Sequence, residues 1–544
     1  MNILAVIPAR GNSKGIPRKN MRLINGNPLL YYSIKTAQNC GAITHIAVSS
    51  DDEEILEYAK EMGIYPIQRD ASLAEDAVTL DPVIFDTVIQ MEKKLETNFD
   101  CVVTMQPTSP LLTSAALNKA IETFIHENID TMLSAVNKPC LSWRKESGTI
   151  VPNYIERLNR QQLPPCYVEA GAFVICKRTV LSETTRIGKN VSVYELSEQE
   201  GIDIDTADEW VLAETILKRK KIIFRADGDR NLGMGHIYRA LTLAYSLTGH
   251  EISFVCNKNY GAGIKKINDS FFPCFEIENE NDFKLLLKQF APDILVMDIL
   301  DTEEKNMLEL KKYCNRLVTF EDKGSGTNVA DAVINALYTQ NDGRPHVYSG
   351  YKYADLRDEF LLREPKEFST MVTNIFVMFG GADPANLTQK VYNTICNNPE
   401  VFKGITVNFI TGLAYDSSRN NIIDRPNDNI FVYNNAKNVS KFMQQADLAI
   451  GSMGRTSFEL VSMAIPSVVI AQNEKEKTHS FTALGNGFLN LGLGEEISEE
   501  TILKTLVWLI STPQVRKEMH QIMRSFNVRK GISRIKKIIL GETV

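Results

Sequence analysis

This sequence of 544 residues lacks paired cysteines, long apolar runs and an excess of positive charge. Its nine cysteines are scattered singly, without a CxxC pair or a zinc-ligand spacing, which argues against a disulfide framework and a zinc site. The apolar run within MNILAVIPAR is too short for a signal peptide or a membrane span, so we expect a cytoplasmic protein without membrane contact. A formal charge of −7 argues against nucleic acid as a partner.

What the sequence does contain is an ordinary globular composition, in a chain long enough for about three or four domains. From residue 1 to about residue 220, short apolar runs alternate with helical patterns, as in βαβ units around a parallel sheet. Strands are expected there at 3–7, 45–49, 101–105, 131–135 and 172–176. The alternation starts again after residue 221 and a third time at residue 374. The predicted fold class is therefore α/β, with a Rossmann-like domain at 1–220 and two further Rossmann-like lobes at 221–365 and 366–544.

A basic loop, within IPARGNSKGIPRKN, directly follows the first expected strand. In parallel α/β sheets, ligands bind at the carboxyl ends of the strands, where glycines let backbone N–H groups approach phosphates. Arg10 and Lys14 can neutralise phosphate oxygens there, and Lys19 reaches the same place from the far side of the loop. Gly11 and Gly15 keep the loop open. The spacing is neither that of a Walker loop nor GxGxxG, and a basic surface loop that binds nothing is the alternative.

Two carboxylates occur at i and i+2 in GIDIDT, which puts Asp203 and Asp205 on the same face of an extended segment. Such a pair can hold one Mg²⁺, a hard cation that prefers oxygen ligands and bridges the phosphates of a nucleoside triphosphate. The alternative is a pair of solvated acids at the end of a strand.

Four motifs, IPARGNSKGIPRKN, QPTSP, RQQLPP and GIDIDT, occur in an order that closely resembles the acylneuraminate cytidylyltransferases, the CMP-sialic acid synthetase family. The resemblance covers residues 1 to about 218 and implies a nucleotidyltransferase, a dimer through this domain, that joins CTP to a nonulosonic acid of the sialic, legionaminic or pseudaminic type. It implies that Arg10 and Lys14 are catalytic and that Asp203 and Asp205 hold Mg²⁺. The residues that it places at CTP are Arg10, Gly11, Lys14, Lys19, Arg69 and Gln106.

One segment departs from this family. Its sialic acid enzymes usually read Arg-Pro-Asn-Gly at the sugar, whereas YVEAGAF places Val168, Glu169 and Ala170 ahead of Gly171. Two polar contacts to the sugar are missing, which leaves open the identity of the acid but not the nucleotide chemistry.

The second half begins with a strand, a glycine-containing loop and a helix, in FRADGDRNLGMGHIYRALTLA. His236 follows Gly233 and Gly235 at the start of that helix, where the helix dipole disfavours the protonated imidazole and keeps it available as a base. A histidine that caps or packs the helix start is the alternative. VMFGGADPANLT repeats the strand and glycine pattern with Gly380 and Gly381.

The segments GMGHIYR, YKYADLRDEF, FGGADPANLT and SFEL with IPSVVIAQNEKEKTH resemble the UDP-sugar hydrolase of pseudaminic acid biosynthesis, a relative of the MurG-like GT-B glycosyltransferases. The resemblance spans about 222 to 500 and implies a GT-B-like module that binds a UDP-sugar, with His236 activating the water that releases UDP from a diacetamido-trideoxy sugar. The UDP-sugar residues that it implies are Gly233, Gly235, Gly380, Gly381, Glu459 and Asn473.

One position of the second half departs as well. Relatives often carry an aromatic residue, commonly Tyr, where this chain has Leu300 in MDILD. Two alternatives to the hydrolase therefore stay open: a glycosyltransferase in which an acceptor hydroxyl replaces water, and a non-catalytic nucleotide-sugar-binding module.

Overall fold

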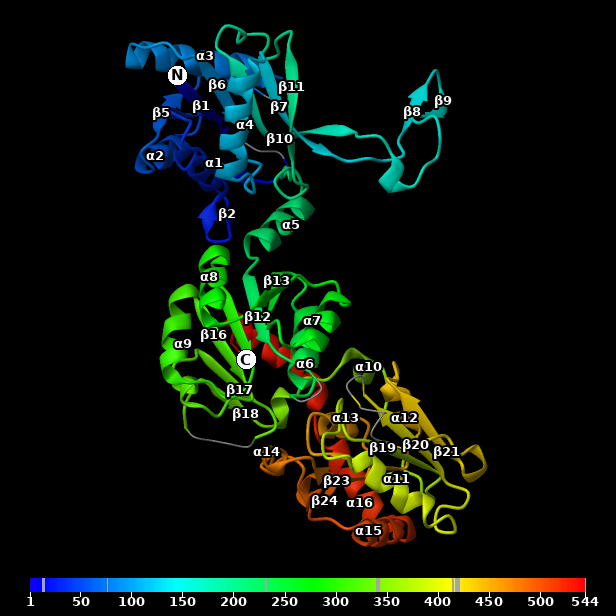
Figure 1. The fold of residues 1–544 in the computed structure, drawn as a ribbon. Helices are drawn as coiled ribbons and strands as arrows, with labels where there is room; N and C mark the ends of the chain where they lie inside the picture. Colours follow the sequence, from blue (N-terminus) through cyan, green and yellow to red (C-terminus); the bar gives the residue numbers. More distant parts are fainter. Residues whose placement is uncertain are drawn as a thin grey trace. The chain divides into compact units, whose positions relative to one another are not determined.

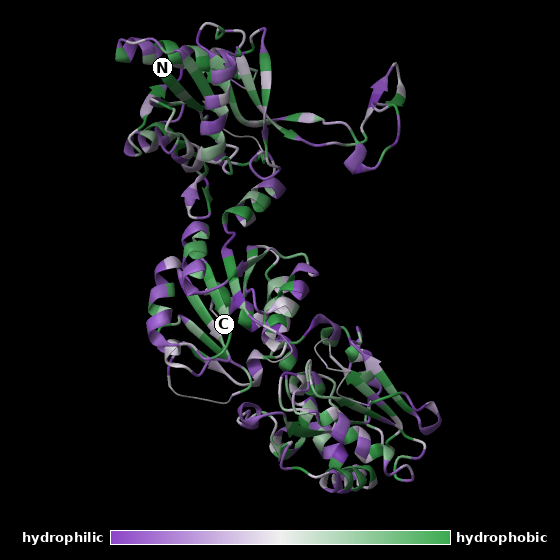
Figure 2. Cartoon of the chain, in the orientation of Figure 1, coloured by the Kyte–Doolittle hydropathy of each residue, from purple (hydrophilic) through white to green (hydrophobic). Residues whose placement is uncertain are grey.

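The computed structural model describes residues 1–11, 15–75, 77–229, 232–338, 343–412, 415 and 421–543. The chain divides into two compact units, Met1–Arg219 and Lys220–Val544. In both units the apolar residues concentrate on the strands and on the helix faces turned toward them (Figures 1 and 2). Within the described ranges, no helix has the length and apolar character that crossing a bilayer requires.

Unit 1 is built on one seven-stranded sheet in the order β11-β7-β10-β6-β1-β4-β5. All five strands expected from the sequence form, at nearly the expected residues. The strands are β1 (Ile3–Pro8), β4 (His45–Ser50), β5 (Tyr65–Gln68), β6 (Cys101–Met105), β7 (Thr131–Asn137), β10 (Tyr167–Lys177) and β11 (Val191–Leu196). Contrary to the expectation of a purely parallel sheet, β10 runs antiparallel to both β6 and β7. The short strands β8 (Trp143–Glu146) and β9 (Thr149–Pro152) project from this sheet on extended segments (Figure 1).

Three helices of unit 1, α2 (Glu53–Glu61), α4 (Ser114–Glu127) and α5 (Ala207–Leu217), begin where a side chain satisfies their first backbone N–H groups. Asp52 accepts from the amides of Glu54 and Ile55, and Thr206 forms a capping box with Glu209. Unit 1 also has helices α1 (Leu29–Gln38) and α3 (Leu80–Leu95). Helices α1 to α4 lie against the sheet, whereas α5 packs through Trp210 and Ala213 on Ile24, Leu29 and Ile204.

The first lobe of unit 2 is a seven-stranded parallel sheet in the order β14-β13-β12-β15-β16-β17-β18. Its strands are β12 (Lys221–Ala226), β13 (Glu251–Asn257), β14 (Cys274–Ile277), β15 (Ile294–Asp298), β16 (Arg316–Phe320), β17 (Ala332–Asn335) and β18 (Val347–Ser349). Its helices are α6 (Gly235–Ser246), α7 (Gly261–Asn268), α8 (Glu280–Phe290) and α9 (Glu304–Leu310).

The second lobe holds a six-stranded parallel sheet in the order β21-β20-β19-β22-β23-β24. Its strands are β19 (Asn374–Met378), β20 (Thr406–Thr411), β21 (Ile430–Asn434), β22 (Leu448–Ser452), β23 (Ser467–Ala471) and β24 (Phe488–Leu493). The helices that follow the first lobe are α10 (Asp358–Leu361), α11 (Leu387–Cys396), α12 (Val439–Gln445), α13 (Thr456–Ser462), α14 (Glu474–Lys477), α15 (Glu499–Ser511) and α16 (Pro513–Arg524). The predicted fold class, one α/β domain followed by two Rossmann-like lobes, is confirmed.

The last helix, α17 (Gly531–Leu540), returns to the first lobe, although the sequence predicts that the second lobe runs to residue 544. Ile535, Ile538 and Ile539 are buried in the core that contains β12 and α6. The Ile538 carbonyl also accepts from the guanidinium of Arg316 at 2.9 Å. An apolar helix face predicts burial but does not tell which lobe buries it, because both lobes offer apolar surfaces.

Candidate functional site

The basic loop of unit 1 lies at the carboxyl edge of the sheet. Arg10 and Gly11 follow β1, and Gln106 follows β6, which pairs with β1 in parallel. Two parallel neighbours therefore bring these residues to one edge, where α/β sheets bind ligands. Lys14, expected to be catalytic, lies outside the described residues.

The two glycines of the loop allow close approach to acidic segments. A Cβ atom on Gly11 would lie 2.5 Å from Asp52 Oδ2, and the Gly11 amide donates to Asp51 Oδ1 at 3.1 Å. A Cβ atom on Gly15 would lie 2.8 Å from the carbonyl oxygen of Asp205. The loop thus packs against the segment that carries the expected metal ligands, and side chains at either glycine would push it away.

The expected magnesium pair lies beside this loop. Lys19 Nζ donates to the Ile204 carbonyl at 2.7 Å and lies 3.2 Å from Asp205 Oδ1. A Cβ atom on Gly171 would lie 2.6 Å from Asp203 Oδ2 and 3.3 Å from Gln106 Nε2. Residues far apart in the sequence, Lys19, Gln106, Gly171 and the two aspartates, therefore surround one place.

Asp203 is the member of this pair with an unpartnered carboxylate oxygen. Its Oδ1 is buried and receives no hydrogen bond of ordinary geometry from the described residues. Burial raises the pKa of Asp203 above its usual range, and Thr108 lies near enough to offset part of this increase. Mg²⁺ binds in nucleotide sites through one or two carboxylates together with phosphate oxygens, so a two-carboxylate site fits it. The described residues contain no cluster of three or more metal-ligating side chains.

Arg69 lies beneath the same edge and is buried, with 5% of its surface exposed. Its Nη2 donates to the carbonyl oxygen of Ser49 at 2.8 Å, and its Nε lies 3.3 Å from the Ser49 hydroxyl. Burial lowers the pKa of Arg69, the negative charge of Asp51 opposes this effect, and the positive charge of Arg10 adds to it. Two guanidinium groups near each other supply positive charge that could neutralise an anionic ligand at this edge.

Unit 2 contains a cavity of about 360 Å³ lined by both lobes. Arg455 of the second lobe donates to the Gly235 carbonyl at 2.9 Å, which joins the lobes at the cavity. Every residue predicted for the UDP-sugar site lines it, and so does Leu300. The predicted lining residues are Gly233, Gly235, His236, Gly380, Gly381, Glu459 and Asn473.

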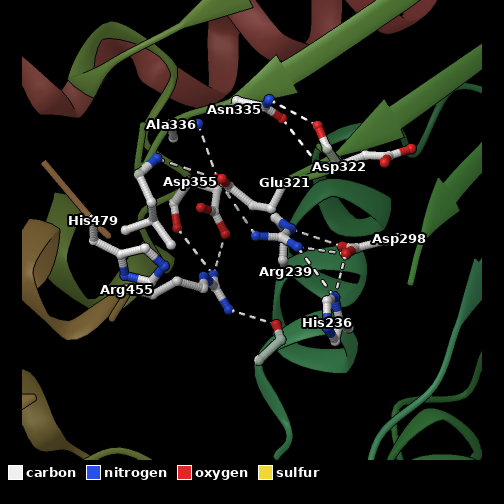
Figure 3. A network of polar contacts seen from close by, with 12 residues as sticks. His236, Arg239, Asp298, Glu321, Asp322, Asn335, Ala336, Asp355, Arg455 and His479 are labelled. Carbon is white, nitrogen blue, oxygen red and sulfur yellow. Dashed lines mark hydrogen bonds and ion pairs between the residues drawn. The ribbon is translucent and has the colours of Figure 1, made fainter. Parts of the chain in front are cut away.

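His236 stands at the start of α6, with its Nδ1 2.7 Å from Asp298 Oδ1 (Figure 3). Arg239, one helical turn further, donates to both oxygens of Asp298 at 2.7 and 2.5 Å. Burial would raise the pKa of Asp298, but the Arg239 charge and its hydrogen bonds outweigh burial and lower it to about 2. Since this ionised carboxylate only accepts, it holds the proton of a neutral imidazole on Nδ1 and leaves Nε2 as an acceptor. This arrangement suits a general base.

Sequence reasoning identified His236 but missed Asp298 and Arg239. The helix N-terminus explains the position of the imidazole, whereas its orientation comes from a carboxylate 62 residues away. A signal was present, because Asp298 ends the buried strand β15 and Arg239 follows His236 by three positions. These positions could be connected with His236 only once the topology placed β15 beside β12.

The remaining predicted residues have local partners within the second lobe. Glu459 Oε1 accepts from Arg357 Nε at 2.9 Å, so that carboxylate has a half-buried cationic partner. The Asn473 side chain accepts from the amide of Glu476 and caps α14. Gly380 has φ 78°, a left-handed conformation that favours glycine.

Comparison with known proteins matches residues 4–163 to the family model described as cytidylyltransferase. Over 228 residues the chain is 32% identical to the pseudaminic acid cytidylyltransferase of Campylobacter jejuni, covering 40% of this chain and 97% of that protein. It is 32% identical over 279 residues to an uncharacterized protein of Methanocaldococcus jannaschii, covering 47% of this chain and spanning 57% of that protein's length.

Other similarities reach into unit 2. The spore coat polysaccharide biosynthesis protein SpsG of Bacillus subtilis is 28% identical over 328 residues, covering 58% of this chain and 96% of that protein. That alignment is longer than unit 1, so part of it lies in unit 2. The crystal structure of Acinetobacter baumannii MurG matches with a TM-score of 0.43 at 15% identity, covering 59% of this chain and 99% of that one.

Proposed function

Because the chain belongs to the cytidylyltransferase family through its first unit, we propose that this unit transfers a cytidylyl group from CTP to a nonulosonic acid and releases pyrophosphate. The observation that carries the proposal is the buried, unpartnered Asp203 Oδ1 beside Lys19 and the basic loop. The name of the Campylobacter jejuni relative favours a pseudaminic type of acid.

In the proposed reaction, the anomeric hydroxyl oxygen of the acid bonds to the α-phosphorus of CTP and loses its proton to solvent, while the bond from that phosphorus to the pyrophosphate oxygen breaks and pyrophosphate leaves. Such transfers depend on positioning and charge neutralisation, and need no nucleophilic side chain. Arg10 and Lys19 supply positive charge at the triphosphate, and Gly11 and Gly15 let the backbone approach it. Asp203 and Asp205 would hold Mg²⁺, which supplies charge neutralisation at the phosphates.

Removal of divalent cations tests this proposal. We expect EDTA to abolish pyrophosphate release from CTP and added Mg²⁺ to restore it, because the carboxylates at Asp203 and Asp205 would otherwise repel the triphosphate. Pyrophosphate is measured with a panel of sialic, legionaminic, pseudaminic and deaminated acids, and the preferred acid identifies the substrate. Unchanged turnover in EDTA would contradict the magnesium assignment, and no turnover with any acid would contradict the substrate class.

For the second unit we propose hydrolysis of a UDP-sugar, a diacetamido-trideoxyhexose nucleotide, with release of UDP. The observation that carries it is the His236–Asp298 pair at the wall of the cavity. His236 Nε2 would take a proton from water as the water oxygen bonds to the anomeric carbon and the bond from that carbon to UDP breaks. Glu459 and Asn473 would lie near the uridine, and Gly380 and Gly381 near the diphosphate.

A UDP-release assay without any acceptor separates hydrolysis from glycosyl transfer. We expect turnover of the UDP-sugar in water alone, and no acceleration when saccharide or lipid-linked acceptors are added. Slow release that an acceptor accelerates would instead identify a glycosyltransferase. Tight UDP-sugar binding with no release under either condition would identify a non-catalytic binding module.

A further inference from the structure

The end of β16 carries a carboxylate with no part in the hydrolysis just described. Glu321 directly follows β16 and has φ 48°, a left-handed conformation that is strained for a residue with a side chain. Its side chain is 8% exposed and lines the same cavity as His236. Such conformations persist where the surrounding structure holds them, and they cluster at ligand sites.

The two oxygens of Glu321 have different surroundings. Oε1 accepts from the backbone amides of Ala336 and Leu337 at 2.9 and 3.3 Å, and lies 3.8 Å from Arg239 Nη1 (Figure 3). Oε2 is buried and has no hydrogen-bond partner among the described residues. Burial raises the pKa of Glu321 to about 7, which is the consequence of leaving a carboxylate incompletely solvated. The backbone amides thus fix the group and leave one oxygen for a donor from outside the protein.

A second residue that lines the cavity, Tyr338, also has an unpartnered polar atom. The Tyr338 side chain follows β17 and is buried, and its hydroxyl makes no hydrogen bond of ordinary geometry within the described part of the chain, although Thr478 lies near. Burial raises the pKa of Tyr338 to about 12, with the negative charge of Glu321 adding to the effect, so the hydroxyl stays a neutral donor. A buried acceptor and a buried donor therefore belong to two residues that line one cavity and lie near enough for the charge of one to act on the other.

We propose that Glu321 and Tyr338 bind the sugar of the nucleotide-sugar. Glu321 Oε2 accepts a hydrogen bond from a ring hydroxyl or an acetamido N–H, and the Tyr338 hydroxyl donates to a sugar oxygen. A carboxylate repels a diphosphate, so the sugar occupies the end of the cavity beside Glu321 and His236, and the diphosphate lies toward Gly380 and Gly381. Tyr338 also supplies a hydroxyl to a cavity whose wall has only an aliphatic side chain at Leu300.

This inference rests on the proposed UDP-sugar substrate, so its test compares UDP-sugar binding with UDP binding. Calorimetry is performed in a His236→Ala parent, to prevent turnover, with UDP, UDP-N-acetylglucosamine and the UDP-diacetamido-trideoxyhexose. We expect Tyr338→Phe and Glu321→Gln each to reduce the ratio of UDP-sugar to UDP affinity about 10-fold. The affinity for UDP itself should stay unchanged in Tyr338→Phe and should be equal or higher in Glu321→Gln, which removes a negative charge. In Glu321→Gln the Ala336 and Leu337 amides donate to the side-chain oxygen of glutamine, which takes the place of Oε1. The N–H₂ group then takes the place of Oε2, and it cannot accept a hydrogen bond from the sugar.

If Tyr338 contributed only to folding, Tyr338→Phe would lower Tm and leave the affinity ratio unchanged. The proposal predicts the opposite for both measurements. Removing the unpartnered Tyr338 hydroxyl leaves the ligand-free protein at least as stable, so the Tm of Tyr338→Phe should be equal or higher. Tyr353→Phe makes the same chemical change in the first lobe at a residue outside the cavity lining, and should leave the affinity ratio unchanged.

The possible failures are distinguishable. An unchanged affinity ratio in Tyr338→Phe and Glu321→Gln, or a parent that binds every UDP-sugar no more tightly than UDP, would overturn the assignment of Glu321 and Tyr338. A reduced ratio, together with no UDP release by the protein that retains His236, would uphold the sugar site and overturn the proposed hydrolysis.

Discussion

Asp203→Asn is expected to lower kcat/KM for pyrophosphate release from CTP about 10³-fold, equivalent to about 4 kcal/mol of transition-state stabilisation. Asparagine retains the shape that packs against Gly171 but removes the negative charge that the unpartnered Oδ1 offers to a cation. Steady-state pyrophosphate release with the preferred acid measures the effect.

The matched control is Asp208→Asn, an exposed acid in the first turn of α5. It removes the same charge from a nearby position and should change kcat/KM less than about twofold, because exposed charges are screened. A loss of equal size in both variants would indicate a general charge effect and would contradict a ligand role for Asp203.

The raised pKa of Asp203 predicts a pH dependence of the cytidylyl transfer. Burial raises the pKa of Asp203, and only the ionised form binds a cation, so activity should rise as pH increases through that elevated pKa. In Asp203→Asn the residual activity should lose this acid limb.

His236→Ala is expected to lower the rate of UDP release from a UDP-sugar by about 10²- to 10⁴-fold, the contribution typical of a positioned general base. The affinity for UDP should stay unchanged, since the nucleotide half of the cavity is formed by other residues, including Glu459 and Asn473. Release is measured by coupled detection of UDP under saturating substrate.

Asp298→Asn tests the orientation of the imidazole. Asparagine keeps only one acceptor oxygen for the donors of His236 and Arg239, so it holds the Nδ1 proton less firmly and UDP release should fall. The buried Arg239 also loses its anionic partner, so Tm should fall as well. His126→Ala, at an exposed residue of α4, is the control and should alter neither property.

Full UDP release in His236→Ala would contradict the role of His236, because it would mean that another group activates the attacking hydroxyl.

Local sequence patterns predicted the strands and the edge at which the first site lies. Apolar runs such as 3–7 and 101–105 are buried on both faces of a sheet, and that burial gives them their composition. Once two such strands are parallel neighbours, Arg10 and Gln106 must follow at the same edge. Gly380 and Gly381, which follow β19, and His236 at the start of α6 reach the second cavity by the same logic.

What the sequence could not predict depends on partners distant in the chain. The direction of β10 is set by its neighbours β6 and β7, and nothing in its own composition distinguishes an antiparallel strand here. In the sequence, Glu321 looks like an ordinary loop acid. Only its backbone conformation and its hydrogen bond from the Ala336 amide, which follows β17, show that its carboxylate is fixed in position. Asp298 likewise can be recognised as part of the site only through its contacts with Arg239 and His236.

Because α17 returns to the first lobe, the core of that lobe cannot be completed early in synthesis. The lobe that carries His236 and Asp298 lacks Ile535, Ile538 and Ile539 until the ribosome has translated past residue 539, so its core is completed only after the strands of the second lobe have emerged. A premature stop codon before residue 531 would therefore damage the lobe that was translated first.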